Sequence, residues 1–149
     1  MMKQSQHGKG AGRRLAGGGL AAALALCLTA ATGAAGANSL RDHKEINNGL
    51  TVIAVGDLIR TNCSTISARM VSAYFFARSL EAKAKAAGFS DDEIEAFVED
   101  KAEKARVMSA ARRYLVARGV DLDVPDSYCQ AGYYEIERNS QIGVLLKAK

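Results

Sequence analysis

The chain has 149 residues, 48% of them hydrophobic and 24% charged, a balance typical of a folded globular domain and not of a disordered chain. Its formal net charge of +4 arises entirely at the N-terminus, where four bases and no acid occur, Lys3, Lys9, Arg13 and Arg14. The rest of the chain has 16 acids and an equal number of bases. It therefore lacks the positive charge on which nucleic-acid binding depends, and we expect no nucleic-acid partner.

Residues 1–37 have the three-part layout of a secretory signal peptide. The basic segment is followed by an apolar run from Leu15 to about Ala31, and a small-x-small motif ending at Ala37 predicts cleavage before Asn38. The apolar run is rich in Ala and Gly and is too short for a comfortable membrane span, which disfavours an uncleaved anchor. We expect a periplasmic mature domain, residues 38–149, that is soluble and reaches the membrane only through a partner.

Two cysteines, Cys63 and Cys129, remain once the leader with Cys27 is removed. In an oxidising compartment, two thiols in a small domain predict one disulfide. It would close a loop of about 67 residues and stabilise the fold by roughly 4 kcal/mol. Free or metal-binding thiols are the alternative.

The mature chain begins with a segment, residues 38–48, for which we expect a loose conformation. The following stretch, Leu50–Arg60, is apolar nearly all round. Its Thr51-Val52-Ile53 run has strand propensity, but the sequence offers no obvious pairing partner. We therefore predict a buried helix over Leu50–Ile59, with a strand as the alternative.

A second helix is predicted from Ser67 to Ala87, closed by Gly88 with Phe89 as the hydrophobic contact past its end. Val71 and Phe75 form an additional apolar patch, which is either core packing in a bundle or an exposed partner surface. The main apolar stripe has helical spacing and consists of Ala73, Phe76, Ala77, Leu80, Ala84 and Ala87, broadened by Met70 and Tyr74.

A long helix is predicted from Ser90 to Gly119. Ser90 and Glu93 have the spacing of a capping box. Acids fill the first half and bases the second, which complements the helix macrodipole, so we interpret the acids as a solvated face and not as a cation site. The predicted apolar face repeats at three- and four-residue steps and comprises Ile94, Phe97, Val98, Ala102, Ala105, Met108, Ala111 and Leu115.

The last predicted helix runs from Pro125 to about Arg138, with proline in its first turn. The apolar tail, residues 140–149, should lie against the bundle or in a partner groove. Its Ile142, Val144 and Leu145 join Val71 and Phe75 as a candidate interaction surface. The predicted fold is an all-α, single-domain bundle of about four helices with one disulfide, preceded by a cleavable signal peptide.

The mature chain has no recognisable catalytic or metal-binding set. Its single histidine, His43, cannot supply a His/Cys zinc cluster, and no G-x-S-x-G motif marks a nucleophilic serine. We therefore predict no catalytic residue, no metal ligand and no cofactor. An enzyme assembled from surface polar residues is an alternative, which a deep pocket with convergent Tyr, Arg and carboxylate groups would support.

Three segments of the chain resemble a small family of exported bacterial proteins catalogued only as a domain of unknown function. The resemblance covers nearly the whole mature chain and both cysteines, and it carries no catalytic residue over. It implies at most an accessory or assembly role at the outer face of the inner membrane. The segments are NNGLTVIAVGDLIRTNC (47–63), ISARMVSAYFFARSLEAKAKAAGFSDDEIEAFVED (66–100) and YCQAGYYEIERNSQIGVLLK (128–147).

The sequence thus favours an exported, non-enzymatic protein-interaction or accessory module of an envelope or respiratory complex, with a protein partner. One alternative is a small disulfide-bonded stress chaperone of the periplasm. The other is the enzyme described above.

Overall fold

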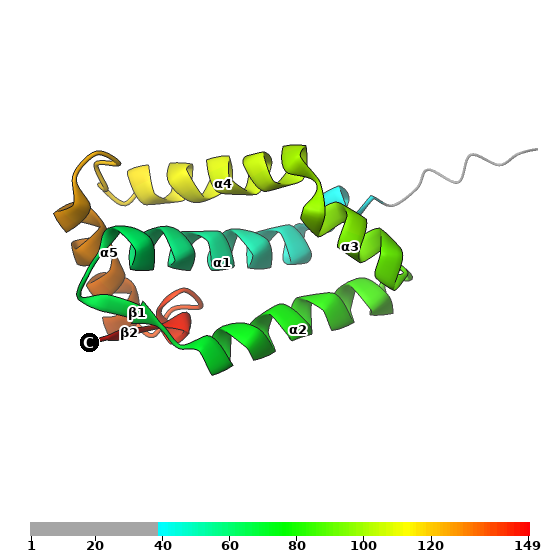
Figure 1. Ribbon diagram of the computed structural model, residues 1–149, viewed down its shortest axis with the longest axis horizontal. Coiled ribbons are helices and arrows are strands. Elements are labelled where there is room, and N and C mark those ends of the chain that lie inside the picture. The colour runs from blue at the N-terminus through cyan, green and yellow to red at the C-terminus, as the bar shows by residue number, and fades with distance from the viewer. Residues whose placement is uncertain (1–38) are drawn as a thin grey trace, which may run out of the picture. The chain divides into compact units, whose positions relative to one another are not determined.

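The computed structural model describes residues 39–149 (Figure 1). This part of the chain is mostly helical, as predicted, but it also contains a small two-stranded sheet. The signal peptide and its cleavage site between Ala37 and Asn38 lie outside the described residues. The elements in chain order are η1 (Leu40–Asp42), α1 (Lys44–Asn62), β1 (Ile66–Ala68), α2 (Met70–Ala86), α3 (Asp91–Glu99), α4 (Lys101–Val116), α5 (Pro125–Glu137), η2 (Gly143–Leu145) and β2 (Leu146–Ala148).

Helix α1 is the central element of the fold. It lies between α2 and α4, with α5 and the two strands near its C-terminal end (Figure 1). Val55 and Ile59 on α1 are fully buried, at 0% exposure. The helix predicted over Leu50–Ile59 is confirmed, and its nearly all-round apolar character follows from its having packed neighbours on several sides.

The expectation of a loose segment over residues 38–48 is wrong for the described residues from Ser39 onward. Leu40 is buried and packs in a cluster with Ile46. The Asn47 side chain donates hydrogen bonds to three backbone carbonyls of this segment, those of Leu40, Arg41 and His43. Apolar burial and these bonds together hold the segment against α1.

The long helix predicted from Ser90 to Gly119 is two helices, α3 and α4, that meet at Asp100. The Asp100 carboxylate accepts a hydrogen bond of 2.8 Å from the Glu103 backbone N–H and so caps a new helix. The Ser90 capping box is confirmed, and Gly119 follows α4 with a φ of +81° as expected for a helix end. The apolar face is also interrupted, because Ala102 and Ala105 are exposed.

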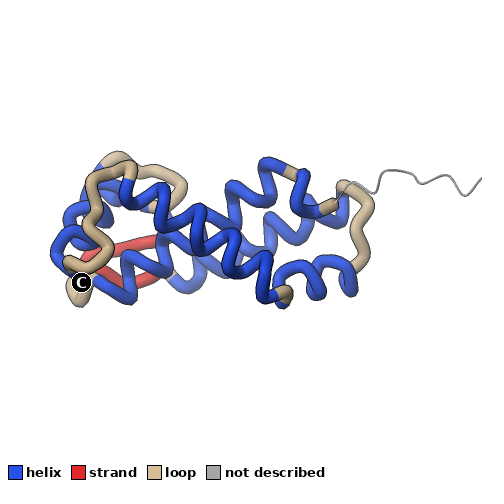
Figure 2. Tube along the Cα trace, turned by 90° about the horizontal axis from the view of Figure 1, so that it is seen from above, coloured by secondary structure: helices blue, strands red, loops and turns tan. Residues whose placement is uncertain are grey.

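The predicted start of the second helix and the end of the apolar tail form strands instead. Ile66–Ala68 pairs antiparallel with Leu146–Ala148, so α2 begins at Met70 and not at Ser67. The apolar tail lies against the helices, as predicted, and its conformation is η2 followed by β2. Seen from above, the two strands lie together at the end of the domain where the chain ends (Figure 2).

The Cys63–Cys129 disulfide predicted from the sequence is present, with the two Cα atoms 5.0 Å apart. It connects the residue directly after α1 to the first half of α5. Around it lies the larger of two hydrophobic clusters, which includes Val55, Ile59, Ile66, Leu115, Tyr128 and Leu146. The smaller cluster, Leu40, Ile46 and Ala84, lies where α2 and α3 meet the start of α1.

Candidate functional site

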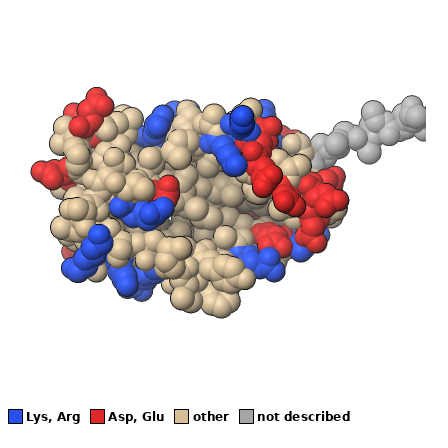
Figure 3. All heavy atoms as spheres, viewed as in Figure 1, with Lys and Arg blue, Asp and Glu red and all other residues tan. Residues whose placement is uncertain are grey.

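Four large apolar side chains on the first two turns of α2 are exposed to solvent. Exposure is 72% for Met70, 70% for Val71, 61% for Tyr74 and 66% for Phe75. The Tyr74 and Phe75 rings contact each other edge to face, with centroids 5.6 Å apart. The surface over this part of α2 is largely free of charged side chains (Figure 3). We call these four residues the α2 patch.

Only two positions of the predicted α2 stripe are buried in the core. Leu80 and Ala84 are buried, whereas Ala77 and Ala87 are exposed. Of the two interpretations of Phe75, core packing and an exposed surface, the structure shows the exposed one.

The tail contributes less to this surface than expected. Ile142 and Leu145 are each only 4% exposed, because η2 packs against α5 and α2. Val144 is 38% exposed and is the one candidate of the three that solvent reaches. The candidate interaction surface is corrected accordingly: Ile142 and Leu145 belong to the core.

A second apolar surface lies over α1 between its flanking helices. Two hollows of about 390 Å³ and about 480 Å³ share the side chains Leu50, Phe97 and Val98. Figure 3 shows this hollowed area, and it shows acidic side chains gathered over α3 beside it. This second apolar surface is thus a depression with an acidic margin.

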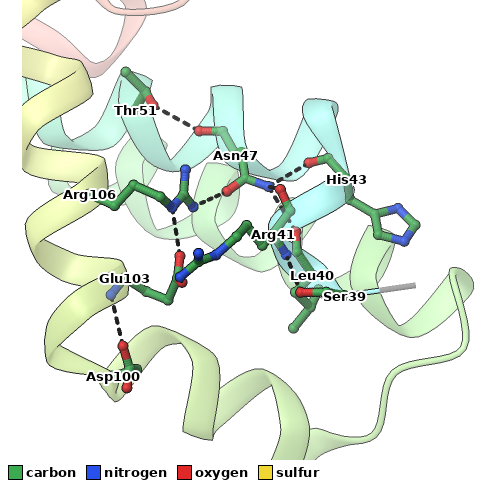
Figure 4. A network of polar contacts seen from close by, with 9 residues as sticks. All are labelled: Ser39, Leu40, Arg41, His43, Asn47, Thr51, Asp100, Glu103 and Arg106. Atoms are coloured by element: carbon green, nitrogen blue, oxygen red, sulfur yellow. Dashed lines mark hydrogen bonds and ion pairs between the residues drawn. The ribbon is translucent and has the colours of Figure 1, made fainter. Parts of the chain in front are cut away.

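Glu103 is the first of two buried glutamates that organise polar networks. Its side chain is 9% exposed; its Oε2 accepts a 2.7 Å hydrogen bond from Arg106 Nε, and its Oε1 accepts one from Arg41 (Figure 4). Arg106 also donates to the side chain of Asn47. Burial raises the pKa of Glu103, but the hydrogen bonds from Arg106 and Arg41 outweigh it, and the pKa lies below its usual value. The network joins the start of α1 to α4.

Glu135 on α5 is the second buried glutamate, and its side chain is 2% exposed. Its Oε1 accepts hydrogen bonds of 2.7 Å from both Tyr114 Oη and Arg118 Nη1. Its Oε2 has no hydrogen-bond partner among residues 39–149, and Arg138 Nε lies 3.9 Å from it. One oxygen of this carboxylate is therefore buried without a hydrogen bond in this part of the chain, and Arg138 is at ion-pair distance from it.

Glu135 is one of the residues that line a cavity of about 260 Å³, which we call the Glu135 pocket. The Arg118 guanidinium stacks over the Tyr114 ring, 4.4 Å from its centroid. The residues that line the cavity are Tyr114, Leu115, Arg118, Gly119, Ser127, Gln130, Ala131, Tyr134 and Glu135.

The protonation of Tyr114 follows from its surroundings. Burial, and then the hydrogen bond to Glu135 and its negative charge, raise the pKa of Tyr114 to about 12. At neutral pH the phenol therefore remains a donor and holds Glu135 Oε1. The sequence alone does not reveal this network, because Tyr114 on α4 and Arg118 just after it are 21 and 17 residues from Glu135 on α5.

Within the described residues, no group of three or more His, Cys, Asp and Glu side chains could hold a metal ion. His43 Nε2 is buried without a hydrogen-bond partner in the same part of the chain, and its ring packs edge to face on Phe89 at 5.2 Å. None of the helices in residues 39–149 combines the length and the apolar character that crossing a membrane requires.

The fold and the disulfide define a small, disulfide-linked helical protein with a short sheet. The model of a family of unknown function (DUF5333) matches residues 38–147, and the chain belongs to this family. This confirms the resemblance to a domain of unknown function. No curated protein and no solved structure matches the chain.

Proposed function

We propose that this protein is an exported, non-enzymatic interaction module, accessory to an envelope or respiratory complex, that binds a partner protein through the α2 patch. The exposure of four large apolar side chains on adjacent turns of one helix carries the proposal. Burying one such side chain stabilises by about 1.5–3 kcal/mol, so a partner that covers the patch gains substantially. Contiguous exposed patches of this kind mark interaction sites.

The charges near the patch indicate the chemistry of the partner. Arg69 directly precedes α2, and Lys147 lies on β2 opposite Ser67 of β1. Both basic residues are exposed. They fit a partner whose apolar contact surface has an acidic margin.

Export is supported by two features of the chain. The N-terminal pattern is that of a signal peptide. The Cys63–Cys129 bridge is of a kind that forms and persists in oxidising compartments.

Site-specific photo-crosslinking tests the proposal. A photoreactive residue at Phe75 is expected to yield one discrete adduct in cells, whereas the same residue at Val116, which is 54% exposed on α4, yields none. The captured protein is then purified and must bind the mature chain in solution. The substitution Val71→Ser should weaken that binding by roughly tenfold, because it removes apolar area from the contact.

Three outcomes would overturn the proposal. They are an adduct only between copies of this chain, equal adducts at both positions, and binding of the purified mature chain to anionic vesicles that Val71→Ser abolishes. The first would indicate self-association, the second unspecific contact, and the third a membrane surface as the occupant.

A further inference from the structure

The second apolar surface over α1 is formed by side chains that the fold leaves partly uncovered. Leu50 and Ile53 of α1 are half-buried although α1 is the central helix, and Met108 of α4 is half-buried beside them. The two hollows share Leu50, Phe97 and Val98, so they form one depression along α1, which we call the α1 groove. The α1 groove shares no residue with the α2 patch.

Helix α3 lines this groove and has an apolar face that the domain does not bury. None of its residues is buried, whereas each of the other α-helices among residues 39–149 has two or more buried residues. Ile94 and Phe97 are half-buried, and Val98 is 43% exposed. The helix connects the end of α2 to the start of α4 beside α1 (Figure 1). A partner that covers this face would complete the burial that an amphipathic helix requires.

The charge of α3 limits what can cover the groove. Its sequence DDEIEAFVE contains five acids and no base. Glu95 lines the groove, is exposed, and is in no ion pair within residues 39–149. An anionic lipid surface is disfavoured by these acids, whereas a basic partner is attracted. The other charged residues of the lining are Lys104 and four acids that already pair with bases of this chain, Asp57, Glu81, Asp91 and Glu103.

The length of the groove is that of a short helix. Its lining residues on α1 extend from Ile46 to Asp57, which is about 17 Å along the helix axis. An α-helix of about three turns has the same length. Amphipathic helices bind in apolar grooves of this kind with side chains spaced at three and four residues.

We propose that the α1 groove binds an amphipathic helix of a partner protein, about three turns long, whose apolar face is flanked by Lys or Arg. Its apolar side chains contact Leu50, Phe97 and Val98, and one of its basic side chains pairs with Glu95. The proposal does not rest on the function proposed for the α2 patch. The two surfaces have opposite charge preferences, since basic residues lie near the α2 patch and acids line the groove.

The test is an NMR titration of the oxidised mature protein, residues 38–149, with a synthetic peptide of two LKKLLKL repeats. This Lys peptide is apolar on one helical face and basic on the other, and it should shift the amide signals of α3 and of residues 50–57 in a saturable manner. A Glu peptide of two LEELLEL repeats should bind at least about tenfold more weakly, because the same apolar face brings like charge to α3. A scrambled Lys peptide without an apolar face should also bind at least about tenfold more weakly, because it offers little apolar area to the groove.

Matched variants locate the binding site. Val98→Lys places a base in the groove and should weaken binding of the Lys peptide by about tenfold or more. Val116→Lys makes the same change at an exposed position of α4 outside the groove and should leave binding unchanged. Glu95→Lys should weaken binding by about fivefold, because an attraction becomes a repulsion, whereas Glu137→Lys on α5 should have little effect. All four positions are exposed, and circular dichroism and thermal unfolding verify that the variants fold.

The proposal is overturned if the Lys peptide shifts no signals of the groove, or if the Glu peptide or the scrambled peptide binds as tightly. It is also overturned if Val116→Lys weakens binding as much as Val98→Lys does.

Three other occupants of the groove would each give a different result, and each result would overturn the proposal. Groove signals that shift when the mature protein is concentrated alone would indicate a second copy of the chain. Tighter binding of a peptide of residues 1–37 than of the Lys peptide would indicate the chain's own leader. Binding to phosphatidylcholine vesicles that Val98→Lys abolishes would indicate a lipid surface.

Discussion

Glu103 and Glu135 are both buried carboxylates held by arginine, yet they are satisfied to different degrees. Both oxygens of Glu103 accept from guanidinium groups, one from Arg41 and one from Arg106. Only one oxygen of Glu135 is bonded, and it accepts from two donors while the other has none within residues 39–149. The first arrangement pairs both oxygens, and the second leaves one buried oxygen with an ion-pair contact of 3.9 Å to Arg138.

The difference separates a fully paired polar network from one that is only partly paired. A fully paired carboxylate returns its desolvation cost through its own contacts and has no acceptor to offer. A half-paired one retains part of that cost. Residues that look alike in sequence and in burial can thus be distinguished by which of their atoms have partners.

The largest expected effect concerns the Cys63–Cys129 disulfide, which is attached to α5, the helix that carries Glu135. Cys63→Ser combined with Cys129→Ser should lower the free energy of unfolding by about 4 kcal/mol, measured by urea denaturation. Hydrogen exchange should accelerate in α5 and in the sheet before it does so at the start of α1. Equal acceleration around Glu103 would show that the two regions do not unfold separately.

The next effect compares the two glutamates directly. Glu103→Gln should destabilise the fold by about 1–2 kcal/mol at neutral pH, because two charge-assisted bonds are weakened. Glu135→Gln should cost about 1 kcal/mol or less, since the glutamine oxygen can still accept from Tyr114 and Arg118. Thermal denaturation of both variants ranks them, and the reverse order would show that Glu103 is not the more strongly paired of the two glutamates.

Acid should distinguish Glu103 from its glutamine variant. The folded-state pKa of Glu103 is lowered, so its contribution is fully present above the usual carboxyl pKa of 4.5 and is lost as pH falls through the lower folded value. The stability gap between wild type and Glu103→Gln should therefore close as the solution is acidified. A gap that persists in strong acid would mean that the loss comes from packing and not from charge.

The smallest effect is on a tyrosine. Glu135→Gln should lower the pKa of Tyr114 from about 12 toward 10. The pKa should stay above 10, because burial still raises it in the variant. Ring-carbon NMR of labelled tyrosine follows the change. Because the folded pKa is raised, the contribution of Tyr114 to stability is present below pH 10 and is lost as pH rises through about 12. An unchanged Tyr114 pKa in the variant would show that Glu135 does not perturb the phenol.

Local signals predicted the helices well. Leu50–Ile59 is helical although its Thr51-Val52-Ile53 run favours a strand, because burial against several elements outweighs local propensity. Pro125 opens α5 and Gly119 follows α4, where the sequence placed them. The break at Asp100 was missed, although Asp100 and Glu103 have the spacing of an N-cap signature, since no Gly or Pro marks it.

The sheet and the polar networks depend on partners far away in the chain. Ile66 pairs with Ala148, and Arg41 reaches Glu103 across 62 residues. Three-residue strands are too short to show an alternating pattern, and charge order along one helix reveals nothing about a guanidinium arriving from elsewhere. For this reason the sequence predicts solvated acids along the whole long helix, whereas Glu103 is buried in the structure.

The bridge and the sheet also set an order of assembly. Cys63 and Thr65 lie early in the domain, but the partners of both come late in the chain. The sulfur of Cys63 is bonded to that of Cys129, and the backbone carbonyl of Thr65 accepts a 2.9 Å hydrogen bond from the Lys149 N–H. A chain that has emerged only as far as α4 therefore holds an unmatched thiol and an open strand edge. The domain therefore closes only after α5 and β2 have emerged, and any segment attached after Lys149 would leave the domain beside Thr65.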